Sequence, residues 1–544
     1  MKRVTVSLSA LLALLILTIA RPVAAPRGAG SAVFNLVEAT VAEMHKAFQT
    51  GLLTSEQLVE MYLARIAAYD GLVNAYIQLD QDALHEARTL DAARREGKIR
   101  RPLEGIPVAL KDIIDTADMP TTGGSVTLEG SFPPDDAFLT AKLRAAGAII
   151  VGKLTLTEFA NFIAIGMPSG YSSLGQFGYN PYDPRRQDDD EPVLSPGGSS
   201  SGSGIAATAN LAALTVGTET SGSILSPASS NGVVGIKPTV GLISRDGIIP
   251  ITADQDTAGP ITRTVTDAAI MLGVMAGFDP ADPATAACLI PGNCLSDYTP
   301  YLDKKALKGA RIAVVPFPDS RADVMNNAIN VLRALGAYVE QIPAFAQQLG
   351  TCVSLPAPAT CSTVLLYGQK RDMNAYLATR GDAQVGQLSD IVALNQVIPG
   401  ALRYGQEIFE AAAMIDTSPG SSDTLRYLAD RAEDLVRSRG ALDAVYHGLD
   451  GVAGTADDFD AVLYADNLQA GITAKAGYPS ITVPGGFRPS GGDVNPRPVG
   501  VTFTGPAFSE ARLIAFAFAF EQATHYRVPP ASTPPLPTDI VTRP

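Results

Sequence analysis

The sequence has few basic residues, and it lacks a second long apolar run. Its 41 lysines and arginines face 55 aspartates and glutamates, which gives a net charge of −14 and a pI near 4.8. Because phosphate binding requires clustered Lys and Arg side chains, this balance argues against a nucleic-acid partner. Beyond the first 25 residues no stretch is long and apolar enough to span a bilayer, so we expect no stable membrane anchor in the mature chain.

The one long apolar run, at the start of the chain, has the pattern of a secretory signal. Lys2 and Arg3 precede an apolar stretch over 8–20, and small residues follow it at 23–25. An uncleaved anchor is the less favoured alternative, because the run is shorter than the ~20 residues of a spanning helix. We therefore expect a signal peptide over 1–25 and a soluble protein that is secreted or periplasmic.

Cysteine is also scarce, with only Cys288, Cys294, Cys352 and Cys361. In an oxidising compartment the simplest connectivity joins the neighbours, Cys288 to Cys294 and Cys352 to Cys361. Zinc is the alternative, but neither pair has C-x-x-C spacing and no histidine lies near them. The acidic segment 450–460 lacks the alternating ligands of a calcium loop, so we expect no metal there.

Short apolar strands alternate with amphipathic helices, which predicts an α/β fold with a mainly parallel sheet covered on both faces. No linker divides the chain. We expect one large domain over 26–544, with a core over about 35–527 and a less regular insertion over about 343–422. The predicted strands span 106–110, 148–151, 232–236, 311–315, 337–342, 461–465, 480–483 and 499–504. The predicted helices begin at the capping boxes Thr40/Glu43 and Thr54/Gln57 or span 140–146, 264–276, 325–335, 425–437 and 510–523.

The segment 197–226 consists of two glycine- and serine-rich loops joined by one helix and one strand, so the two loops should meet. Its G-x-S-x-G match would make Ser200 the nucleophile of a Ser-His-Asp enzyme, with His447 or His525 as base. A nucleophile elbow follows a buried strand, whereas a polar, proline-rich loop precedes Ser200. Neither histidine lies in a motif, so the sequence favours a different serine mechanism.

A lysine can replace the histidine as base. Lys111 ends an apolar strand, and burial there would lower its pKa from about 10.4 toward neutrality. One serine hydroxyl then relays a proton, and a second, Ser223 on a tight glycine turn, attacks a carbonyl. The successive N–H groups of Thr220, Ser221, Gly222 and Ser223 are the predicted oxyanion hole.

Several motifs together resemble the amidase signature family. They are VALKD ending at Asp112, GGSSSGS from Gly197, GTETSGSI from Gly217, GVVGIKPT from Gly232 and GYPS from Gly477. The resemblance implies a single α/β/α domain around a mixed sheet and a Ser-cisSer-Lys triad. In that triad Lys111 is the base, Ser199 is the relay serine after a cis peptide bond, and Ser223 is the acylated nucleophile. Amide hydrolysis through an acyl-enzyme, with no cofactor or metal, is the implied reaction.

The chain departs from the family motif D-x-G-G-S-I-R at Glu219, Ser221 and Leu225. Loss of the arginine argues against substrates with a carboxylate beside the scissile amide. These variants, with VGLISRDGIIP from Val240, look most like the bacterial peptide amidase branch, so we expect a peptide amide or a small acyl amide as substrate. Two alternatives stay open: an exported binding protein with an inactive amidase fold, and a glutamine amidotransferase-type subunit, which the signal sequence disfavours. Oligomeric state is not predicted.

Overall fold

The structure, a computed structural model, describes residues 32–97, 101–345, 363–381, 384–448, 450–488 and 496–543. The predicted signal peptide and the predicted Cys352–Cys361 pair lie outside these residues. Within them, no helix has both the length and the apolar character needed to cross a membrane. Cys288 and Cys294 are joined by a disulfide bond.

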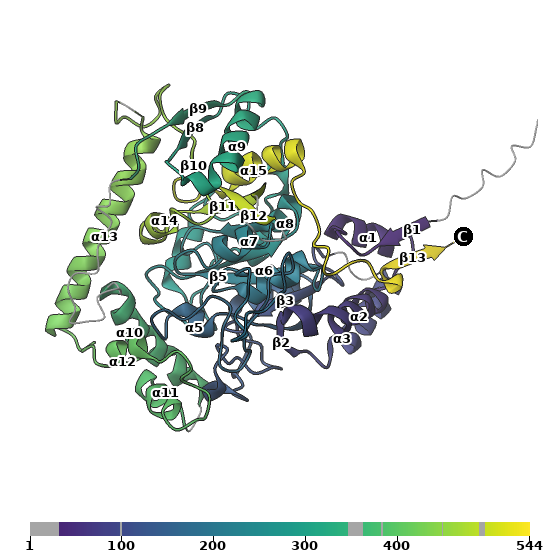
Figure 1. The fold of residues 1–544 in the computed structure, drawn as a ribbon, viewed down its shortest axis with the longest axis horizontal. Coiled ribbons are helices and arrows are strands. Elements are labelled where there is room, and N and C mark those ends of the chain that lie inside the picture. The colour runs from purple at the N-terminus through teal and green to yellow at the C-terminus, as the bar shows by residue number, and fades with distance from the viewer. Residues whose placement is uncertain are drawn as a thin grey trace, which may run out of the picture.

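An eleven-stranded sheet forms the centre of the molecule (Figure 1). At one end β4, β3 and β5 run parallel, and at the other end β10, β8 and β9 do so. From β5 to β10 every neighbouring pair is antiparallel. In order, the strands are β2 (Tyr76–Leu79), β4 (Ile149–Leu154), β3 (Pro107–Lys111), β5 (Leu214–Glu219), β7 (Thr257–Thr262), β6 (Val234–Lys237), β11 (Ser480–Arg488), β12 (Arg497–Thr504), β10 (Ala461–Ala465), β8 (Arg311–Val314) and β9 (Tyr338–Gln341).

This arrangement confirms the α/β class but corrects the mainly parallel sheet that the alternation predicted. The sheet is mixed, as the family resemblance implied. β6 and β7 follow each other with no helix between them, and no described helix separates β11 from β12. Parallel neighbours need a crossover connection, usually a helix, so these directly joined strands pair antiparallel.

Helices pack on both faces of the sheet. α6 and α7 contact each other and the central strands, while α8, α9 and α15 form a second contacting group against β6, β7 and β11. The helices are α1 (Val41–Gln49), α2 (Ser55–Val73), α3 (Ala83–Arg95), α4 (Phe138–Ala145), α5 (Glu158–Asn161), α6 (Ser201–Thr208), α7 (Leu225–Ser230), α8 (Val265–Met275), α9 (Ala322–Ala334), α10 (Thr363–Arg380), α11 (Leu388–Asn395), α12 (Glu407–Ala413), α13 (Ser422–Tyr446), α14 (Ala470–Ala476) and α15 (Glu510–Thr524). Both predicted capping boxes are present, at the starts of α1 and α2.

The predicted irregular insertion over 343–422 is largely helical where the structure describes it. α10, α11 and α12 lie there and lead into α13, which stands along one side of the molecule (Figure 1). α10 is buried around much of its circumference, with Val364, Leu366, Tyr367 and Met373 all buried. A helix buried on several sides has no single apolar stripe, which is why periodicity did not reveal it. Far from α13, β1 (Ala32–Asn35) and β13 (Ile540–Arg543) pair near the two chain ends (Figure 1).

Candidate active site

Lys111 ends strand β3 and is completely buried. Its Nζ donates hydrogen bonds to Ser199 Oγ at 2.7 Å and to Thr218 Oγ1 at 3.0 Å. Thr218 lies on β5, the parallel neighbour of β3, so the strand pairing brings this hydroxyl beside the lysine. Burial lowers the pKa of Lys111 to about 7, although the negative charges of Asp256 and Glu219 act against that shift. A substantial fraction of this amine is therefore neutral near pH 7.

Ser199 lies at the end of the first glycine-rich loop, just before α6. The Gly198–Ser199 peptide bond is cis, as the family resemblance implied. The Ser199 carbonyl accepts from the N–H of Thr157 at 2.9 Å, which holds the loop against the chain that follows β4. Gly197 is required here, because it has φ +69° and an added Cβ would meet the Ser226 carbonyl oxygen at 2.8 Å. These contacts direct the Ser199 hydroxyl toward Lys111.

Ser223 lies on the second glycine-rich loop, which meets the first as the sequence predicts. Its carbonyl accepts from the N–H of Ser200 at 3.2 Å, so the turn rests on the start of α6. Gly222 supplies the left-handed conformation of the turn, with φ +85°. Ser223 is 8% exposed, and no hydrogen bond in the described residues engages its hydroxyl. That hydroxyl is thus available to a molecule entering from solvent.

Glu219 holds this turn in place, a role that the sequence did not suggest. Its carboxylate accepts from the N–H of Gly222 at 2.7 Å, of Ile224 at 2.8 Å and of Leu225 at 3.1 Å. The predicted oxyanion hole therefore needs a correction, since the Gly222 N–H already has a carboxylate partner. The N–H groups of Thr220, Ser221 and Ser223 have no such partner in the described part of the chain. The acidic motif position was visible in the sequence, but its partners depend on how the turn folds back.

Ser200, the nucleophile of the alternative mechanism, has a structural role instead. It is fully buried, and its hydroxyl donates to the Thr218 carbonyl at 3.0 Å and accepts from the Thr218 N–H at 3.1 Å. No strand precedes it in the way an elbow requires, since the preceding element along the chain is the short turn α5. His447 and His525 are each the C-cap of a helix, and neither takes part in the hydrogen bonds that hold the Ser200 hydroxyl.

Two other lysines in the described part of the chain are fully buried, and their partners differ from those of Lys111. Lys153 Nζ donates to the Ile114 carbonyl at 2.6 Å and lies 3.9 Å from a carboxylate oxygen of Asp112. Lys237 Nζ donates to the Tyr478 carbonyl at 2.7 Å. Both bind backbone carbonyls and so fix loops, whereas within the described residues Lys111 donates only to the hydroxyls of Ser199 and Thr218. Lys111 is therefore the best placed of the three to exchange protons with a serine.

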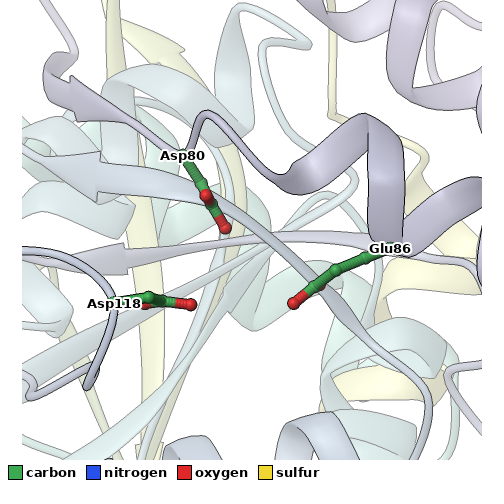
Figure 2. A group of neighbouring side chains, drawn as sticks. All are labelled: Asp80, Glu86 and Asp118. Carbon is green, nitrogen blue, oxygen red and sulfur yellow. The ribbon is translucent and has the colours of Figure 1, made fainter.

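One acidic cluster has the spacing of a possible cation site. Among the described residues, Asp80, Glu86 and Asp118 direct carboxylate oxygens toward one another (Figure 2). Arg144 forms ion pairs with Glu86 at 2.7 Å and with Asp118. Because this guanidinium already supplies positive charge to the cluster, we assign it no metal. It shares no residue with the Lys111 site.

Together these contacts place a buried lysine of lowered pKa against one serine hydroxyl, and a second, accessible serine on an adjacent turn. Such a set can deprotonate an alcohol and stabilise the oxyanion of a tetrahedral intermediate. The sequence predicts Lys111, Ser199 and Ser223 as site residues; the structure places Lys111 against Ser199 and the loop of Ser223 against the start of α6, and their catalytic roles stay predictions. Sequence reasoning missed Thr218 and the role of Glu219.

Comparisons with known proteins show which family the chain belongs to. A sequence model of the family described as Amidase matches residues 57–514. A probable amidase of Arabidopsis thaliana is 39% identical over 513 residues, covering 92% of this chain and 93% of that protein. A glutamyl-tRNA(Gln) amidotransferase subunit from Rhodopirellula baltica is 32% identical over 522 residues, covering 91% of this chain and 98% of that protein.

A solved structure, the native peptide amidase from Stenotrophomonas maltophilia, superposes with a TM-score of 0.79 at 38% identity. The superposition covers 91% of this chain and 99% of that one. The fold, the family motifs and these relatives agree over nearly the whole described chain. The chain therefore belongs to the amidase family and is a hydrolase of amide C–N bonds.

Proposed function

We propose that this chain is an exported amidase that hydrolyses a carboxamide through an acyl-enzyme on Ser223, with Lys111 as base and Ser199 as proton relay. The observation that carries the proposal is the 2.7 Å hydrogen bond from Lys111 Nζ to Ser199 Oγ. The lysine is buried and has a pKa of about 7, so it can accept a proton at neutral pH.

In the proposed acylation step, Ser223 Oγ attacks the amide carbonyl carbon. Its proton passes to Ser199 Oγ while the Ser199 proton passes to Lys111 Nζ, so the amine becomes an ammonium ion. The oxyanion accepts hydrogen bonds from the N–H groups of Thr220, Ser221 and Ser223. The intermediate then expels ammonia or an amine, which takes back the proton through Ser199. Water next attacks the acyl group by the same route and releases the acid.

The substrate that we propose is a peptide with a C-terminal amide, or a small acyl amide. The similarity to the Stenotrophomonas peptide amidase supports this class. Leu225 stands where many family members have an arginine, and its N–H is bound to Glu219. The turn therefore offers no cation from position 225 to pair with a substrate carboxylate.

Mapping a covalent adduct tests the nucleophile. A fluorophosphonate should label the purified protein at Ser223, and Ser223→Ala should abolish both labelling and amide hydrolysis. Ser221→Ala is the matched control, because it removes an exposed hydroxyl from the same turn and keeps the backbone N–H. Labelling at Ser200, with loss of activity in a His447 or His525 variant, would instead support the elbow mechanism.

The substrate class is tested by ammonia release from amidated peptides, aryl amides and glutamine, assayed side by side. Hydrolysis of amidated peptides in preference to the others is the expected result. A strong preference for glutamine would favour the amidotransferase-type role, given the relatives that carry that name. If the wild type hydrolyses none of the panel, the inactive binding protein becomes the better account.

Export is proposed from the signal pattern over 1–25 and from the cysteine pairs. Expression with the native N-terminus in a bacterial host, followed by fractionation and N-terminal mass spectrometry, tests it. A mature chain that begins near residue 26 in the periplasm or medium is expected. An intact N-terminus in the cytosol would contradict export without affecting the proposed chemistry.

A further inference from the structure

The loop over 251–256 holds the turn over 220–223, which carries Ser223, through hydrogen bonds separate from those of Glu219. Thr220 Oγ1 donates to Asp256 Oδ1 at 2.6 Å, and the Thr220 carbonyl accepts from Gln255 Nε2 at 3.3 Å. Thr220 and Gln255 are both buried, so these bonds have little competition from water. The first residue of the turn is therefore fixed through both its side chain and its backbone.

Asp256 is itself held rigidly. Its second carboxylate oxygen, Oδ2, accepts from the N–H of Ile251 at 2.8 Å and of Thr252 at 2.9 Å. The aspartate thus closes its own loop with one oxygen and holds Thr220 with the other. The charged groups that interact with Asp256 are Arg245 on the preceding segment and Lys111 at the end of β3.

Helices α10 and α13 also form hydrogen bonds with the 251–256 loop. Arg431 of α13 donates to Asp254 Oδ1 at 3.1 Å, and Tyr427 of the same helix donates to Asp254 Oδ2 at 2.9 Å. From α10, the carboxylate of Asp372 accepts from the N–H of Ala253 at 2.7 Å. A continuous series of hydrogen bonds therefore runs from α10 and α13 through the 251–256 loop to Thr220.

We propose that Asp256 is a positioning residue for amide hydrolysis, which acts through the Thr220 hydroxyl to hold the N–H groups of Thr220 and Ser221 toward the reacting carbonyl. The inference rests on the proposed function, because it assumes that Ser223 is the nucleophile of this turn. Within the described residues Asp256 forms no hydrogen bond to Lys111, Ser199 or Ser223. Its effect is to keep the oxyanion donors in place before the substrate arrives.

The simpler account is that Asp256 only stabilises its own loop. Thr220→Val separates the two accounts, because it removes one hydroxyl, leaves the volume nearly unchanged and leaves the Asp256 bonds to Ile251 and Thr252 intact. Thr220→Ser restores the hydroxyl. Thr215→Val is the matched control: Thr215 is a buried residue of β5, the strand that leads into the turn, and its hydroxyl donates to the Ile261 carbonyl at 2.8 Å.

We expect Thr220→Val to lower kcat by roughly 10- to 100-fold at nearly constant KM, since a misplacement of about 1 Å in an active site can cost ~100-fold. Thr220→Ser should keep most of the wild-type rate. Thr215→Val should lose a similar amount of thermal stability yet keep its kcat. The rate of fluorophosphonate labelling at Ser223 should follow the same order across the variants.

Asp256→Asn gives a second test through a double-mutant cycle. Because both residues act through one hydrogen bond, Thr220→Val in the Asp256→Asn background should add no further loss of kcat. Independent, multiplicative losses would overturn the proposal, as would Thr220→Val with wild-type kcat in an active enzyme. A wild type that neither hydrolyses amides nor labels at Ser223 would overturn the proposed function and this inference with it. Activity that disappears in Ser223→Ala but survives undiminished in Thr220→Val overturns the inference alone.

Discussion

Acylation should fail as the pH drops through neutrality, because Lys111 must be neutral to accept a proton. Burial places its pKa at about 7. For a single titration with that pKa the neutral fraction is roughly 90% at pH 8 and roughly 1% at pH 5. The rate should therefore fall about 90-fold over this interval, and the fall should approach about tenfold per pH unit below pH 6. A lysine at its usual pKa of about 10.4 would instead give a rate that still rises steeply from pH 8 to pH 10.

The assay is the pH dependence of kcat/KM for ammonia release, which reports groups of the free enzyme. The rate of fluorophosphonate labelling at Ser223 measures the nucleophile with a different leaving group and should show the same acid limb. Asp256 requires a control, because burial raises its pKa to about 7 as well. Its negative charge raises the pKa of Lys111, so Asp256→Asn should keep the acid limb and move it to lower pH.

Two results would refute this reasoning. A labelling rate unchanged from pH 8 to pH 5 would remove Lys111 as the base. Disappearance of the acid limb in Asp256→Asn would assign the titration to the aspartate. In Lys111→Met, by contrast, the residual rate should be low and should lack this limb. Circular dichroism must show that both variants keep the fold, so that a lower rate can be attributed to the missing side-chain group and not to unfolding.

Three further predictions concern the turn, the disulfide and the chain ends. Glu219→Gln leaves one acceptor oxygen for three N–H groups, so kcat should fall at least roughly tenfold in the amide assay, and an unchanged rate would contradict the role of Glu219. Replacing Cys288 and Cys294 with alanine opens a short loop, so it should cost about 2–3 kcal/mol of unfolding free energy or less and leave activity intact in parallel melting and rate assays. Arg65→Met leaves Asp539 buried without its ion pair and should cost about 3–5 kcal/mol in urea unfolding. Arg88→Met, which breaks an exposed pair with Glu56, is its control and should cost about 1 kcal/mol or less.

Much of the site could be predicted because local sequence patterns indicate which residues are buried. The apolar strand before Lys111 indicated that the amine would be desolvated, and the structure buries it completely. The two glycine-rich loops were expected to meet, and the Ser200–Ser223 backbone hydrogen bond joins them. Thr218 and Glu219 were missed because their partners are set by the pairing of β5 with β3 and by the backward fold of the turn. Neither feature leaves a periodic signal in the sequence.

The fold errors have the same physical origin. Short apolar runs predict strands but not their directions, so the antiparallel centre of the sheet could not be distinguished from a parallel one by pattern alone. In α10 the apolar residues surround the helix instead of forming one stripe, so the sequence pattern predicted an irregular insertion there. Only the resemblance to a known family indicated the mixed sheet.

The hydrogen bonds around the turn over 220–223 show which of its polar groups can still bind a substrate. Buried polar groups in folded proteins are nearly always paired, so the few unpaired groups in a well-bonded site are significant. Around the turn, Glu219 binds the N–H of Gly222, Asp256 binds the Thr220 hydroxyl, and Lys111 binds Ser199. Within the described residues, the groups of the turn without hydrogen-bond partners include the Ser223 hydroxyl and the N–H groups of Thr220, Ser221 and Ser223. One nucleophile and a set of donors are what a carbonyl carbon and its oxygen require, so the reacting amide should bind with its carbonyl oxygen toward these N–H groups.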